Sequence, residues 1–98
     1  MRLWDATDDQ IKKALVALAI EHVLLEIGKP VLEKVTSKLF HEYHCYIPDC
    51  YERPEHLNNV LKDLFGNSYI EIVKSINQRL EQFSSQKSIN RFLKVINQ

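Results

Sequence analysis

Two histidines and two cysteines lie close together near the middle of the 98-residue chain, and they are the residues best suited to chemistry. His41, His44, Cys45 and Cys50 have side chains that bind zinc, and the two histidines share a helix face. His44 and Cys45 are adjacent, so on a helix they point about 100° apart and both ligate one ion only where the helix frays. The H-x-x-H-C-x-x-x-x-C spacing matches no standard zinc motif. Buried thiols and a histidine-rich helix end explain the same residues, so we expect no metal and no other cofactor.

The same residues raise a second interpretation, a thiol nucleophile. Cys50 with His44 or His56 has the residue types of a thiol–imidazole pair. Nothing in the sequence orients such a pair, and the chain lacks a glycine-rich oxyanion turn, a phosphate-binding glycine loop and an H-E-x-x-H motif. We therefore predict no catalytic residue and a protein that is not an enzyme.

The most apolar segment, Ile11 to Ile27, is predicted to organise the elements around these residues. Thr7 and Gln10 have capping-box spacing and predict the helix start, and Gly28 predicts a left-handed end. One stripe recurs at steps of four and three and contains Ile11, Leu15, Leu18, His22 and Leu25. The remaining surface is also largely apolar, so the helix must be covered on more than one side. Either the other helices or a second copy covers it, and we predict a homodimer whose interface includes Leu15, Leu18, His22 and Leu25.

Four further helical segments follow, each with apolar residues on one face. The first of them begins at Lys29-Pro30, and its apolar stripe contains Leu32, Val35, Leu39, Tyr43 and Tyr46. The other three run from Pro54 to Gly66, from Ser68 to Phe83 and from Ile89 to Ile96. Ser68 and Glu71 form a second capping box. In the loop Cys45 to Arg53, Ile47 is expected to plug the core and Tyr51 to cover it. We predict an all-α fold with a single helical domain over residues 1–98, a compact bundle of four to five short helices.

Composition and charge limit the partners of this domain. The formal net charge is zero, which argues against nucleic acid as the main partner. Acidic residues dominate from His41 to Val73 and basic residues from Lys74 onward. The acidic part of one chain could attract the basic part of another across a dimer, or both parts could simply be solvated surfaces. The longest apolar run, Ala14 to Ile20, is too short for a membrane span, and the acidic N-terminus has no signal core. We expect no membrane contact and a cytoplasmic location.

The tight turns between the second, third and fourth segments also suit a helix-turn-helix. Residues 68–83 would then form the recognition helix. Lys74, Asn77 and Gln78 are acceptable base readers, whereas Glu71 repels phosphate. A DNA-binding transcriptional regulator is therefore the alternative to a protein–protein interaction module.

Two long stretches have the pattern of a known family. These are LLEIGKPVLEKVTSKLF and RPEHLNNVLKDLFGNSYIEIVKSI, joined through Ile47-Pro48. The matching positions are Gly28, Leu39, Tyr43, Ile47, Pro54, Leu57, Leu64-Phe65-Gly66 and Ile72. Over roughly residues 11 to 80 the chain resembles the fifth Nitrosopumilus output domain, a small archaeal domain of unknown function. The resemblance implies a helical output module in signalling or regulation, with an unidentified protein partner and no catalytic residue; the segment after Ser84 departs from the shorter family pattern.

Overall fold

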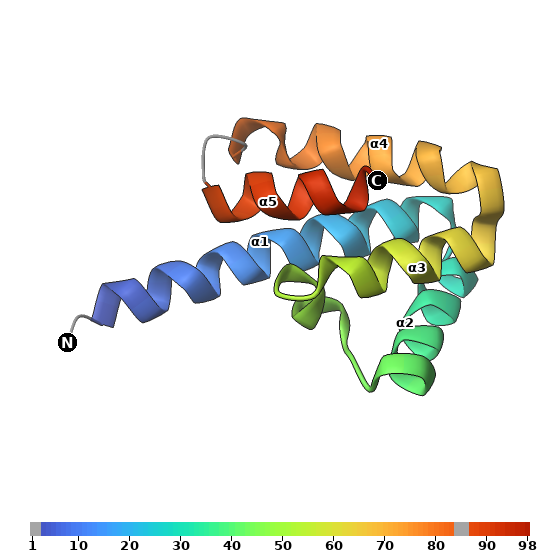
Figure 1. The fold of residues 1–98 in the computed structure, drawn as a ribbon, viewed down its shortest axis with the longest axis horizontal. Helices are drawn as coiled ribbons and strands as arrows, with labels where there is room; N and C mark the ends of the chain where they lie inside the picture. Colours follow the sequence, from blue (N-terminus) through green and yellow to red (C-terminus); the bar gives the residue numbers. More distant parts are fainter. Residues whose placement is uncertain (1–2, 84–86) are drawn as a thin grey trace.

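The protein folds into a bundle of α-helices joined by short 3-10 turns (Figure 1). The computed structural model describes residues 3–83 and 87–98, and the side chains of 10–82, 87 and 89–98. The elements are α1 (Leu3–Ile27), α2 (Lys29–Tyr43), η1 (Ile47–Tyr51), α3 (Pro54–Phe65), η2 (Gly66–Ser68), α4 (Tyr69–Leu80), η3 (Glu81–Phe83) and α5 (Lys87–Ile96). No strand occurs within the described residues, which confirms the predicted all-α class.

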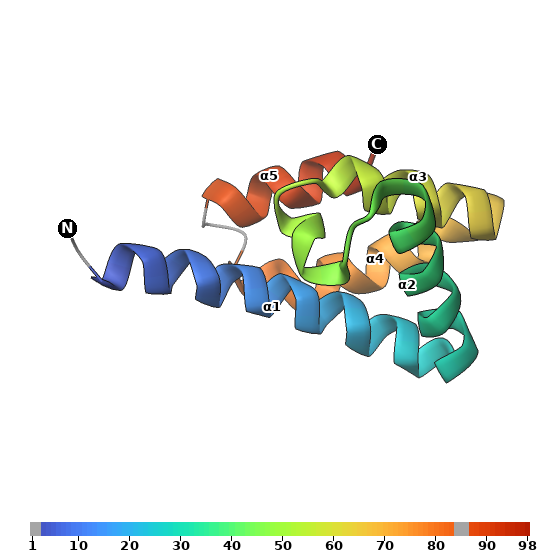
Figure 2. The ribbon, with the colours of Figure 1, turned by 90° about the horizontal axis from the view of Figure 1, so that it is seen from below.

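The long helix α1 spans most of the molecule, which measures 42 × 26 × 22 Å. It packs against η1, α2 and α4, whereas α3 packs against α2, η1 and α5. Helices α3, α4 and α5 run in alternating directions, and the first turns of α1 extend beyond them (Figure 1). The other helices therefore lie on one side of α1, which forms an edge of the molecule (Figure 2).

The start of α1 differs from its prediction. The backbone is helical from Leu3, so Thr7 lies inside the helix and the predicted capping box is wrong. Residues 3–6 contain neither Gly nor Pro, so nothing in them opposes an additional helical turn.

The two faces of α1 have different environments. Its core face consists of Val16, Ala17, Ala19, Ile20, Val23 and Leu24, all buried. The predicted stripe lies on the opposite face: Ile11, Leu18 and Leu25 are 52%, 51% and 46% exposed, His22 is exposed and Leu15 is half-buried. The stripe therefore lies outside the core of a single chain, because α4, η1 and α2 all pack on the other side.

Gly28 both ends α1 and begins α2. Its N–H donates to the Leu24 carbonyl at 3.0 Å, and its own carbonyl accepts from the N–H groups of Val31 and Leu32 at 3.0 and 3.3 Å. Its φ and ψ are 159° and 147°, so Gly28 has a positive φ that side chains other than glycine rarely adopt, but not the αL conformation that is usual after a helix. The reason is that the next helix begins at once, at Lys29.

Helix α2 ends at Tyr43 because His44 adopts a left-handed conformation, with φ 51° and ψ 42°. The His44 N–H donates to the Phe40 carbonyl at 2.9 Å, and that of Cys45 donates to the Leu39 carbonyl at 3.3 Å. These bonds satisfy carbonyls at the helix end. The predicted place of Tyr46 on the apolar stripe of this helix is wrong, since its side chain is 63% exposed.

The segment predicted as a loop contains the 3-10 turn η1. Ile47 and Tyr51 are buried, as predicted. Lys13 of α1 lies 3.7 Å from an Asp49 carboxylate oxygen and donates to Glu52 Oε1 at 3.1 Å. These two pairs connect α1 to the segment that carries both cysteines.

The turn between α3 and α4 depends on Gly66. Its φ of 56° lies in the range that favours glycine, and its N–H donates to the Lys62 carbonyl as α3 ends. Ser68 precedes α4, but its side chain makes no capping hydrogen bond, so the second predicted capping box is wrong. Ser68 itself has helical angles, with φ −69° and ψ −12°, whereas an N-cap residue usually has extended ones.

Candidate functional site

The four metal-ligand candidates lie in two different environments. His41 and His44 are exposed, and each ring packs edge-on against Phe40, with centroid distances of 6.2 and 5.6 Å. Cys45 and Cys50 are buried, and their thiols donate to the Tyr46 carbonyl at 3.5 and 3.8 Å. Throughout the described residues, no group of three His, Cys, Asp or Glu side chains is arranged to hold a metal ion.

The same burial disfavours thiolate chemistry. Burial raises the pKa of Cys45 and raises that of Cys50 further, because a charged thiolate loses solvation there. A reactive cysteine needs a depressed pKa and some solvent access. The Cys50 thiol is fully buried and directed at a carbonyl, which is the arrangement of a small core residue.

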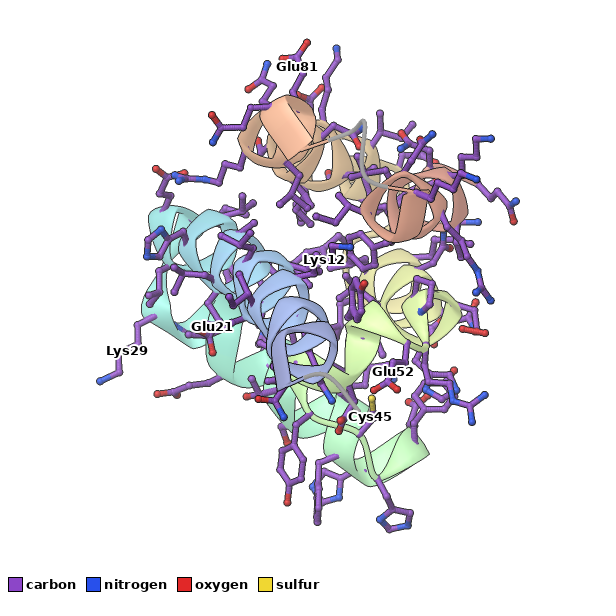
Figure 3. All side chains as sticks on the ribbon, turned by 90° about the vertical axis from the view of Figure 1, so that its left-hand side faces the viewer. Lys12, Glu21, Lys29, Cys45, Glu52 and Glu81 are labelled. Atoms are coloured by element: carbon purple, nitrogen blue, oxygen red, sulfur yellow. The ribbon has the colours of Figure 1, made fainter. Side chains whose placement is uncertain are left out.

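A polar hollow of about 710 Å³ lies beside these cysteines, between the end of α2, η1, the start of α3 and α5. Its acidic, basic and histidine lining residues are His44, Asp49, Glu52, Arg53, His56 and Arg91. The His56 ring stacks on Tyr43 with centroids 4.1 Å apart, and among the described residues its buried Nδ1 has no hydrogen-bond partner. Figure 3 shows Cys45 and Glu52 close together on this side of the molecule. Because both guanidinium and carboxylate groups line the hollow, its charges favour neither an anionic nor a cationic ligand.

The predicted interface residues form an exposed, mostly apolar line along α1. We call Ile11, Leu15, Leu18, His22 and Leu25 the contact stripe. From Ile11 to Leu25 it extends about 21 Å, at 1.5 Å per residue. Figure 3 looks down α1 from its start, with Lys12 on the side of α3 and α5 and Glu21 on the opposite side of α1. Scattered exposed leucines are ordinary, but an aligned series of this kind is typical of a protein contact surface.

A second exposed apolar feature escaped the sequence analysis. Phe40 is 43% exposed, and its ring lies 5.7 Å from that of Tyr46. The αL turn at His44 brings the two rings together across the end of α2. In the sequence, Tyr46 follows Tyr43 by three residues, and this helical spacing predicted a buried position for Tyr46 instead of an exposed one beside Phe40.

Basic side chains collect on α5 rather than on the predicted recognition helix. Lys87, Arg91 and Lys94 are all exposed at steps of four and three. On α4, Lys74 is exposed together with the acid Glu71. Asn77 on that helix exchanges two amide hydrogen bonds with Asn97, at 2.9 and 3.1 Å. Arg79 pairs with Glu26 of α1. The α4 face therefore offers few unengaged groups to a phosphate backbone.

Comparison with protein-family models, curated proteins and solved structures finds no match. The resemblance to the archaeal output domain stays a prediction. Within the part of the chain that the structure describes, no helix is both long and apolar enough to cross a membrane.

Proposed function

We propose that this protein is a helical protein–protein interaction module that forms a homodimer through the contact stripe on α1. The carrying observation is that Ile11, Leu18 and Leu25 each expose about half of their surface along one line of a helix. The opposite face of the same helix is fully used by the core. The resemblance to an output domain supports a role in signalling or regulation, and we propose no catalytic activity.

Burial of the stripe provides the driving force for association. Full burial of a leucine or isoleucine side chain stabilises by about 1.5–3 kcal/mol, and about half of that burial is still open at Ile11, Leu18 and Leu25. Association also costs translational, rotational and side-chain freedom. We therefore expect a reversible dimer that dissociates on dilution.

Sedimentation velocity over a concentration series tests this proposal with a matched pair of variants. Leu18→Glu places a charge in the contact stripe, and Ile70→Glu places the same charge on α4 at a residue that is equally exposed, at 55% against 51%. We expect Leu18→Glu to be monomeric and Ile70→Glu to dimerise like the unmodified protein. Equal dimerisation of both variants would exclude the contact stripe as the interface.

A DNA-binding regulator remains the second candidate, now because of the exposed Lys87, Arg91 and Lys94 on α5. Phosphate neutralisation by these side chains would weaken binding steeply as salt rises. Fluorescence anisotropy with labelled duplex DNA tests it at low and moderate salt. An Arg91→Glu variant should lose such binding, with Lys34→Glu on α2 as the control. No binding by the unmodified protein at low salt would remove this candidate.

A further inference from the structure

We propose that the two copies pair their α1 helices antiparallel, with Leu18 facing the partner's Leu18 at the two-fold axis. This inference rests on the proposed function and adds the orientation and register of the contact. It follows from the spacing of the stripe, from the charges beside it and from the place of α1 in the fold.

Within the contact stripe, Ile11 and Leu25 are placed symmetrically about Leu18, and Leu15 and His22 nearly so, three residues before it and four residues after it. Ile11 lies seven residues before it and Leu25 seven residues after it. Reversing one helix therefore brings Ile11 against the partner's Leu25, and Leu15 against the partner's His22. A two-fold dimer requires such a self-complementary surface, in which each contact occurs twice.

Charges beside the stripe disfavour the parallel alternative. In a parallel pair of helices, a residue that directly precedes a contact position lies close to a residue of the partner helix whose number is higher by five. That relation brings Glu21 against the partner's Glu26, twice in each dimer, and His22 against the partner's His22. In the antiparallel register, Glu26 instead lies near the partner's residues 10 to 12, at the opposite end of the helix from the partner's Glu21 and Glu26. The Glu26 side chain is 64% exposed even though it pairs with Arg79, so it still senses a partner's charge.

The fold leaves the stripe accessible to another helix. The packing partners of α1 are η1, α2 and α4, which contact the face of Val16, Ile20 and Leu24. Because α1 forms an edge of the molecule (Figure 2), two copies can approach through this face with their bundles on opposite sides.

Cysteine cross-linking in a glutathione redox buffer tests the register. Two thiols and glutathione disulfide exchange to give one protein disulfide and two reduced glutathiones, so electrons and protons balance. The variants are Ile11→Cys, Leu25→Cys, the double variant Ile11→Cys/Leu25→Cys, and Leu18→Cys. The unmodified protein reports any background from Cys45 and Cys50, both of which are buried.

We expect Leu18→Cys and the double variant to form covalent dimers on non-reducing gels, and each of the other single variants to remain mostly uncross-linked. Residues 11 and 25 of one helix are about 21 Å apart, so the double variant cannot close a disulfide within a chain. Efficient cross-linking of Ile11→Cys alone would show a parallel dimer, which overturns the register but keeps the proposed function. Sedimentation of the unmodified protein as a monomer would overturn both. A dimer in which Leu18→Cys does not cross-link would overturn the register, and the Leu18→Glu variant would then decide whether the contact stripe is the interface.

Discussion

Asn58 of α3 donates its side-chain amide to the Val95 carbonyl at 2.9 Å and, through the same nitrogen, to the Ile96 carbonyl at 3.1 Å. Asn58 is only 5% exposed, and it is a buried polar residue that apolar periodicity could not identify. The last carbonyls of a helix have no partners within the helix, so Asn58 satisfies those at the end of α5. This contact fixes α5, with its buried Ile89, Phe92 and Ile96, against α3.

Replacing Asn58 by Ala is expected to destabilise the protein by about 2 kcal/mol, because the buried Ile96 carbonyl loses its Asn58 donor, whereas the Val95 carbonyl still accepts from the Gln98 N–H at 3.2 Å. Urea unfolding followed by circular dichroism measures the change. Asn59→Ala is the matched control, since Asn59 is exposed and its side-chain amide donates to the Tyr43 hydroxyl at 3.3 Å. A loss for Asn58→Ala no larger than that for Asn59→Ala would contradict the role of the α3–α5 contact.

Gly66→Ala is expected to cost about 2 kcal/mol in the free energy of unfolding, from backbone strain alone. A Cβ at this position meets nothing within 4 Å, but φ is 56°, which side chains other than glycine rarely adopt. Thermal or urea unfolding checks the effect, with Asn67→Ala as the neighbouring exposed control. A stability unchanged by Gly66→Ala would show that the α3–α4 turn tolerates another conformation.

The buried cysteines predict a loss of stability at alkaline pH. Burial raises the pKa of Cys50 in the folded protein above its ordinary value of 9.0. Above that pH the unfolded thiol ionises while the folded one stays protonated, so the unfolded state binds fewer protons and stability falls as pH rises. The pKa of Lys13 is also raised, mainly by its hydrogen bond to Glu52, so its stabilising charge is lost only above its ordinary 10.5.

Urea midpoints at pH 7 and pH 10 under reducing conditions therefore report mainly on the thiols. We expect the midpoint to be lower at pH 10, and the Cys50→Ala variant to show a smaller difference between the two values, whatever its stability at pH 7. A difference as large in Cys50→Ala as in the unmodified protein would assign the alkaline loss to other groups.

His22 is the polar member of the contact stripe, and its replacement is expected to tighten the dimer. His22→Leu places an apolar side chain against the partner's Leu15 in the antiparallel register, so the dissociation constant should fall several-fold. Sedimentation equilibrium measures it, and His41→Leu, an exposed histidine on α2, provides the control. A weaker dimer for His22→Leu would mean that the imidazole contributes a specific hydrogen bond across the interface.

Helix periodicity and stop residues were sufficient to predict most of the fold. Pro30 and Pro54 lie in the first turns of α2 and α3, and Gly66 ends α3, because each restricts or frees the backbone where a helix must begin or end. Both capping boxes were wrong because their spacing is local and does not show where the helical backbone begins. Thr7 lies within a longer helix, and Ser68 lies within a 3-10 turn.

The candidate site was predictable in part. Periodicity identified the stripe from Ile11 to Leu25, but it could not tell which apolar face of α1 the core uses, since both faces are apolar. Nor could it place His44, whose left-handed backbone ends α2 and brings Phe40 close to Tyr46. Such relations depend on packing between segments far apart in the sequence, as does the contact between Asn58 and Val95.

The most direct test of the dimer proposal is the equilibrium mass of the unmodified protein at high micromolar concentration. The chain has a mass of 11.5 kDa. Sedimentation equilibrium should give a mass near twice this value that falls toward 11.5 kDa on dilution. A mass of 11.5 kDa throughout the concentration range would contradict the proposal that α1 binds a second copy.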